Sequence, residues 1–110
     1  MKIYIDLSVL SSSGLAIGRV SGVLEFAAVP PVGSSVMLTR PTNDVPLIAV
    51  GGFSGSLKVA DLWFEPASVD INIALSLEDV VVASVEDGRR VMSFLENGFG
   101  LSSEEYDYDE

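Results

Sequence analysis

Residues 57–77 read LKVADLWFEPASVDINIALSL, and this stretch decides the fold class. From position 69 to position 77 apolar and polar residues alternate, which is the period-two pattern of a strand with one buried face. Positions 57–64 form a second candidate strand, and the Glu-Pro-Ala-Ser run at 65–68 is typical of a turn. The stretch therefore predicts an antiparallel hairpin, and the alternation places Trp63 on the more polar face of its first strand.

Three upstream segments also have the composition of strands: residues 2–9, 18–28 and 36–39. The first of these alternates clearly, with isoleucine, leucine and valine on one face and mostly polar side chains on the other. Pro30-Pro31-Val32-Gly33 ends the second segment, because proline cannot donate a ladder hydrogen bond. Residues 80–83 fit either a last short strand or the approach to a helix.

The pattern changes to a helical one at Ser84. Ser84 followed by Asp87 resembles a capping box, and apolar residues at positions 85, 91, 92 and 95 then recur at helical spacing. Gly98, directly after Asn97, predicts the end of this helix. Gly88 lies inside the helix, where glycine is less favourable than alanine by about 1 kcal/mol.

These elements predict a β-rich α+β fold. We expect five or six mostly antiparallel strands, arranged as a meander or as a small, partly closed barrel, with one C-terminal helix that covers or plugs one end. An open α+β sheet is the main alternative. Residues 1–101 are expected to form a single globular domain, and residues 102–110 an acidic disordered tail, because acidic residues dominate that segment and it has little to bury.

The chain lacks cysteine and histidine, and these absences exclude several kinds of chemistry. Thiolate metal sites, thiol nucleophiles, histidine-based triads and ordinary zinc sites all need one of the two residues. The 16 acidic and 6 basic residues give a net charge of −10, so no basic face is expected that could neutralise nucleic-acid phosphates. No apolar run is long enough for a secretion signal or a membrane span. We therefore expect a cytoplasmic protein without direct nucleic-acid or membrane contacts.

The sequence predicts no catalytic, cofactor-binding or metal-binding residue. The adjacent carboxylates at Glu78-Asp79 and Glu86-Asp87 cannot face one site together on a strand or a helix. The glycine cluster at 51–55 lacks the lysine and hydroxyl residue of a phosphate loop, and it indicates a bulge or a tight turn. Ser54 has no histidine to act as its base. We expect a protein that is not an enzyme, with a carboxylate- or metal-dependent enzyme as the least favoured alternative.

Two features are candidates for binding another protein. A tryptophan on the polar face of a strand is a common interface anchor, although Trp63 also fits a second small core under the helix or a loop. The acidic tail combines charge with aromatic rings, so it is either a solvating segment or an arm that steers a cationic partner. The residues with a predicted partner-binding role are Trp63, Glu104, Glu105, Tyr106, Asp107, Tyr108 and Asp109.

The segment Gly22-Val23-Leu24-Glu25-Phe26, followed by residues 30–33, resembles the strand-and-turn opening of many small bacterial β-domains. In composition, the short acidic chain without cysteine is also similar to bacterial immunity proteins and to nucleic-acid-mimicking inhibitors. This resemblance implies a non-catalytic binding module that occludes a basic partner protein. The alternative is a structural or self-assembling β-domain that forms a homodimer through exposed strand edges or through the face with Trp63.

Overall fold

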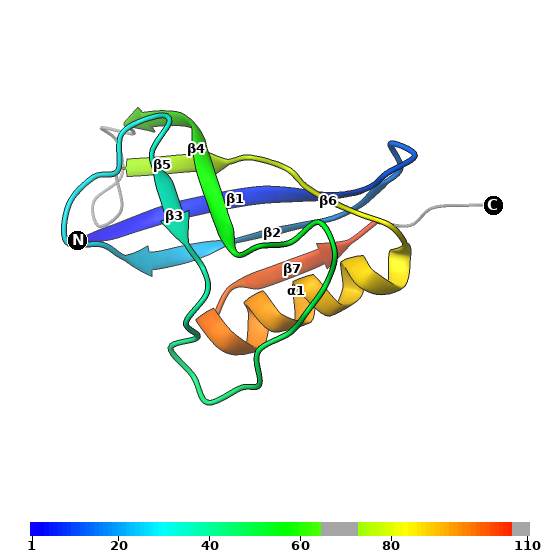
Figure 1. Ribbon diagram of the computed structural model, residues 1–110. Coiled ribbons are helices and arrows are strands. Elements are labelled where there is room, and N and C mark those ends of the chain that lie inside the picture. Colours follow the sequence, from blue (N-terminus) through cyan, green and yellow to red (C-terminus); the bar gives the residue numbers. More distant parts are fainter. Residues whose placement is uncertain (65–72, 107–110) are drawn as a thin grey trace.

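The computed structural model describes residues 1–64 and 73–106 of the chain (Figure 1). These residues form seven strands and one helix. In chain order the elements are β1 (Lys2–Ser11), β2 (Ala16–Glu25), β3 (Ser35–Met37), β4 (Ser56–Phe64), β5 (Ile73–Leu77), β6 (Val80–Val82), α1 (Val85–Phe99) and β7 (Ser102–Glu105). The fold is therefore β-rich α+β, as predicted, with more strands than the expected five or six.

The strands form one open, mixed sheet in the order β3-β4-β5-β1-β2-β7, with β6 continuing beside β1 past the end of β5. The pairs β1–β2, β2–β7, β3–β4 and β4–β5 are antiparallel, whereas β5 and β6 both run parallel to β1. A mostly antiparallel sheet is thus confirmed, and the sheet is open, as in the main alternative, so a simple meander and a partly closed barrel are wrong. The meander fails because β5 lies directly beside β1. The barrel fails because β3 and β7 lie at opposite margins of the sheet and do not pair.

The predicted hairpin is present as the antiparallel pair β4–β5, although residues 65–72, which include its turn and the start of the alternating run, lie outside the described residues. The register shifts between Val59 and Asp61, so Ala60 is an extra residue in β4. This shift places Val59 opposite Leu77 and Leu62 opposite Leu75, on the same side of the sheet. Strict alternation through β4, which predicted opposite faces for Val59 and Leu62, is therefore wrong at the bulge.

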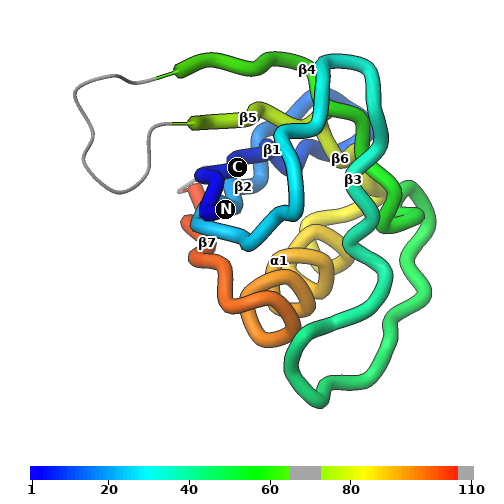
Figure 2. Tube along the Cα trace, turned by 90° about the vertical axis from the view of Figure 1, so that its left-hand side faces the viewer, coloured from blue at the N-terminus to red at the C-terminus, as the bar shows by residue number. Residues whose placement is uncertain are grey.

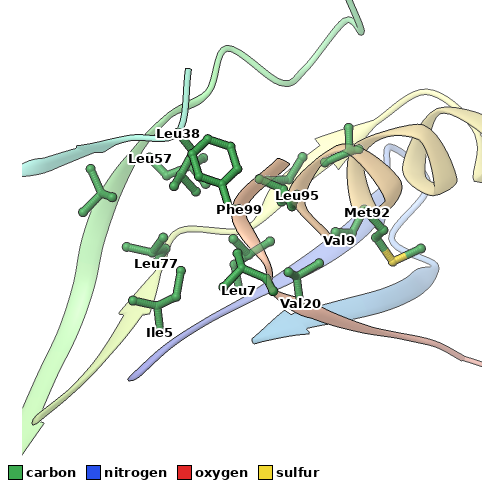
Figure 3. Packing of buried hydrophobic residues seen from close by; sticks show 14 of the residues in the cluster. Ile5, Leu7, Val9, Val20, Leu38, Leu57, Leu77, Met92, Leu95 and Phe99 are labelled. Atoms are coloured by element: carbon green, nitrogen blue, oxygen red, sulfur yellow. The ribbon is translucent and has the colours of Figure 1, made fainter. Parts of the chain in front are cut away.

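The hydrophobic core lies between one face of the sheet and α1 (Figure 3). The central strand β1 contributes its whole inward side, since Ile3, Ile5, Leu7 and Val9 are at most 2 % exposed. The helix contributes a stripe that includes the fully buried Leu95. Full burial of an aliphatic side chain of this size stabilises the fold by about 1.5–3 kcal/mol. A one-residue shift in register would move these side chains to the opposite face, so their burial fixes the register of β1 against its neighbours.

The helix begins where the sequence predicts and ends two residues later. The Ser84 hydroxyl accepts a hydrogen bond from the Asp87 backbone N–H at 3.2 Å, which confirms the predicted cap. The helix passes through Gly98 and ends at Gly100, whose φ of 73° gives the left-handed cap. Gly98 is buried beside the loop that carries Pro41 and Val45, where a Cβ atom would lie 3.1 Å from each of their side chains. Neither α1 nor any other part of the described chain is a helix long and apolar enough to cross a membrane.

The C-terminal segment is ordered further than the sequence predicts. Ser102–Glu105 forms β7, which pairs antiparallel with β2, and the Tyr106 backbone N–H donates to the Ile17 carbonyl at 2.9 Å. An acidic disordered tail beginning at residue 102 is therefore wrong for these residues. The polar sequence of β7 buries little, but its backbone completes the edge of β2. Residues 107–110 lie outside the described residues.

Candidate functional site

The sheet has one face packed on α1 and one face that no element of the described chain covers (Figure 2). We call the second the uncovered face. Strand register assigns to it the side chains that alternate with the buried ones. These residues are Lys2, Tyr4, Asp6, Ser8, Arg19, Ser21, Val23, Glu25, Asp61, Trp63, Ala74, Ser76, Ser102 and Glu104.

A row of apolar side chains crosses the uncovered face at the end of the hairpin. Trp63 lies opposite Ala74, Ala74 lies beside Tyr4, and Tyr4 lies opposite Val23, so the four occupy neighbouring positions on four adjacent strands. Trp63 and Val23 are each 38 % exposed, whereas Ala74 between the larger side chains is buried. Directly facing cross-strand neighbours on one face are close enough to touch. The row is therefore a continuous, partly exposed aromatic and aliphatic strip with Trp63 at its outer end.

Three carboxylates border this strip, those of Asp6, Glu25 and Asp61, and we call them the acidic frame. Asp61 precedes Trp63 by two positions and shares its face, and Asp6 lies in the next row beside Ser76. Arg19 donates from Nη2 to the Tyr4 hydroxyl at 3.2 Å and lies 3.8 Å from the Asp6 carboxylate. Arg19 is thus held against the sheet by its two neighbours and partly offsets the charge of Asp6, whereas Asp61 forms no ion pair among the described residues.

Glu25 closes the frame at the start of β1. Its carboxylate lies 2.6 Å from the N-terminal ammonium group of Met1, and it lies opposite Lys2 in the β1–β2 register. The hydrogen bond and the charge of the terminal ammonium group lower the pKa of Glu25, with a smaller contribution from Lys2. The ion pair therefore favours the charged form of this carboxylate.

The structure separates the two predicted binding features. Glu104 is on the uncovered face opposite Arg19, whereas Glu105 points to the other side and forms a two-oxygen contact with Arg89 of α1, with N–O distances of 2.8–3.1 Å. Tyr106 is half-buried, and Asp107, Tyr108 and Asp109 lie outside the described residues. Four strand spacings separate β4 from β7, so Trp63 and Glu104 stand roughly 19 Å apart across the sheet. They belong to one face but to its opposite margins.

The carboxylate pairs stand apart from this strip and do not converge. Glu78 accepts a hydrogen bond from the Lys58 backbone N–H at 2.6 Å, and Asp87 lies beside Arg90 in the first turn of α1. Among the described residues, no three acidic side chains form a group that could hold a metal ion. The glycine cluster forms the predicted tight turn, in which the Phe53 N–H donates to the Val50 carbonyl at 3.1 Å.

A concave feature lies on the other side of the molecule, between α1 and the loop at 45–48. It is a groove of about 460 Å³. Its lining comprises Val45, Pro46, Ile48, Glu86, Arg89, Arg90, Ser93, Phe94 and Asn97. The backbone N–H groups of Thr42 and Asn43 donate to the Gly98 carbonyl at 2.9 and 3.0 Å, which fastens the loop to the helix end. The basic groups at its rim already face acidic ones, Arg89 with Glu105 and Arg90 with Asp87, so the groove offers mainly its apolar floor.

Sequence reasoning found Trp63 but missed its neighbours in the strip. The alternation in β1 predicts that Tyr4 faces away from the core, and the alternation in β2 predicts the same for Val23. The missing information is the register, since the parallel contact between β1 and β5 joins segments 70 positions apart, as at Tyr4 and Ala74. The groove was missed because its loop has no periodic pattern.

Comparisons with known proteins found no relative of this chain. No protein-family model matches the chain, and neither a curated protein nor a solved structure resembles it closely enough to count as a match.

Proposed function

We propose that this protein is a small, non-catalytic binding module that docks another protein on its uncovered face. The observation that carries the proposal is the partly exposed strip Trp63–Ala74–Tyr4–Val23, set in a frame of carboxylates. Large aromatic side chains surrounded by polar residues are the usual energetic centre of a protein interface. The frame selects the chemistry of the partner, because carboxylates around an apolar strip attract a basic surface.

The net charge of −10 supports the same kind of partner. A strongly acidic protein accelerates its encounter with a basic one by electrostatic steering, and the aromatic strip then supplies contacts that form only on docking. The most concrete version of this role is an immunity or inhibitor protein that covers a cationic cleft of its target. Such a protein acts by steric and electrostatic occlusion, so it needs no catalytic residue and no metal.

The aromatic strip is tested by comparing Trp63→Ser with Leu47→Ser as baits for proteins from the host. Leu47 is 70 % exposed but lies in the loop beside the groove, so its replacement removes exposed apolar surface away from the strip. We expect a basic protein that is retained by the wild type and by Leu47→Ser and is lost with Trp63→Ser. Equal retention by all three chains would exclude the strip as the binding site.

The acidic frame is tested with the purified partner by the association rate at low and at physiological ionic strength. Asp61→Lys, which reverses a charge beside Trp63 on the uncovered face, should slow association more than Asp44→Lys, which reverses a charge in the exposed loop beside the groove. Salt should slow association of the wild type, because screening shortens the range of the field to about 8 Å at physiological ionic strength. Association that is independent of salt but abolished by EDTA would favour the metal-dependent alternative.

A further inference from the structure

The outer edge of β4 is only partly paired. β3 pairs with Ser56–Lys58, and the backbone groups of Val59 bond to Ser34 and Gly33, each at 2.9 Å. From Ala60 to Phe64 the described chain places no strand on this side of β4, which forms one margin of the molecule (Figure 2). Unpaired N–H and C=O groups along such an edge are a template for another strand.

The side chains along this open edge are unusually apolar for an unprotected strand. Phe64 is 63 % exposed and Trp63 is 38 % exposed, on opposite faces of β4, and Leu62, which precedes them, is half-buried. Leu62 and Phe64 point to the same side as α1, but the end of the hairpin extends beyond the part of the sheet that the helix covers (Figure 1). Solvent therefore reaches apolar side chains on both faces beside an unpaired backbone.

We propose that the open edge of β4 pairs antiparallel with the same edge of a second copy of this chain, about a two-fold axis at Leu62. In a two-fold antiparallel pair each residue lies opposite the one at equal distance on the other side of the axis. With the axis at Leu62, all five open residues in the described part of β4 pair. A two-fold axis at any other of these residues leaves part of the open segment unpaired.

The side chains fit this register. Leu62 faces Leu62 of the second copy on the side of the helix, and the small, exposed Ala60, which is the bulged residue of β4, lies opposite the large Phe64. On the uncovered face Asp61 lies beside Trp63 of the second copy. An axis at Asp61 would instead place two carboxylates directly opposite each other, which is destabilising. Residues 60–64 therefore complement the same residues of a second copy: a small side chain lies opposite a large one, and an acidic one beside an aromatic one. For this reason we choose a second copy, and not an unrelated strand, as the partner.

The dimer goes beyond the proposed function and does not depend on it. Edge pairing uses the margin of the sheet, so the strip Trp63–Ala74–Tyr4–Val23 stays on the face of the joined sheet, one strip from each copy on the same side. The two associations respond to salt in opposite ways. Each copy carries a net charge of −10, so screening strengthens self-association and weakens capture of a basic partner.

Self-association is measured by sedimentation equilibrium on the purified full-length chain over a wide range of concentration. We expect a monomer–dimer equilibrium that shifts to the dimer as salt is added. Phe64→Lys should abolish the dimer, and Leu47→Lys, which makes the same change at a similarly exposed position outside the edge, should leave it unchanged. A wild-type chain that stays monomeric at every concentration, or a dimer that survives Phe64→Lys, would overturn the proposal. Circular dichroism of each variant verifies that it is folded.

The register is tested by cross-linking, because the natural chain has no cysteine and any introduced thiol is unique. Leu62→Cys should form a disulfide-linked dimer on mild oxidation, since residue 62 lies opposite itself. Asp61→Cys should not link to itself but should link when mixed with Trp63→Cys. Leu47→Cys serves as the control for random collision. Self-linking of Asp61→Cys at the expense of Leu62→Cys would refute the axis at Leu62.

Discussion

Gly52 shows how a single residue fixes the approach of two segments. Its φ is +92°, and a Cβ atom there would lie 2.0 Å from the Val81 carbonyl oxygen, so the turn at residues 50–53 and strand β6 meet where only glycine fits. Gly51, its neighbour, has no atom within 4 Å of the equivalent position. The two adjacent glycines therefore have different reasons for being glycine, which their shared sequence context does not reveal.

Replacement of Gly52 by alanine should destabilise the protein by about 2–5 kcal/mol, the sum of left-handed backbone strain and a close contact with backbone. Gly51→Ala is the matched control and should change the free energy of unfolding by less than about 1 kcal/mol. Urea denaturation followed by Trp63 fluorescence measures both. Similar values for the two variants would contradict the close packing of this turn on β6.

At the residue scale, alternation predicted burial well wherever a strand is regular. Ile3, Ile5, Leu7 and Val9 are buried as expected, and Tyr4 faces away from the core with the polar residues of β1. The exception lies in β4, where the extra residue Ala60 reverses the phase of the pattern. A bulge of this kind depends on the hydrogen bonds of the neighbouring strand, which periodicity within one segment does not contain.

At the scale of elements, β7 is the clearest departure from the sequence-based expectation. Its four residues are polar, so hydrophobic patterning does not identify it as a strand. Contacts outside the segment hold it, among them the ladder with β2, the hydrogen bond from Ser103 to the Glu96 carboxylate, and the ion pair of Glu105 with Arg89. The helix and β7 therefore stabilise each other, a relation that tertiary structure alone reveals.

Removal of β7 should lower stability, in contrast to what a disordered tail would do. A chain that ends at Leu101 loses the backbone pairing of β2 and leaves Arg89 without its carboxylate partner, so we expect a clearly lower melting temperature than for a chain that ends at Tyr106. The second truncation is the control, because it keeps β7 intact while removing acidic residues. Equal melting temperatures would show that β7 contributes nothing to the folded state.

At the scale of the whole molecule, charge opposes the compact state. The described ion pairs occupy Arg19, Arg89, Arg90 and the terminal ammonium group, and such exposed pairs stabilise proteins only by about 0–1 kcal/mol each. With 16 acidic and 6 basic residues, most carboxylates have no basic residue to balance them. Order in the sheet is thus maintained by the core against a general repulsion that acts over the surface.

Sodium chloride should therefore stabilise the protein at neutral pH. The field of unbalanced carboxylates extends about 30 Å at 0.01 M salt and only about 8 Å at physiological ionic strength, so screening removes repulsion from the folded state more than it weakens the few short ion pairs. The urea midpoint should rise over this range of salt. Near the sequence pI of about 4.1 the net charge is close to zero, and the same salt should have little effect there, which separates screening from a general action of salt on apolar surface. A midpoint that falls with salt at neutral pH would mean that attractive pairs such as Arg89–Glu105 outweigh the repulsion, and that the net charge is not the main electrostatic influence on this fold.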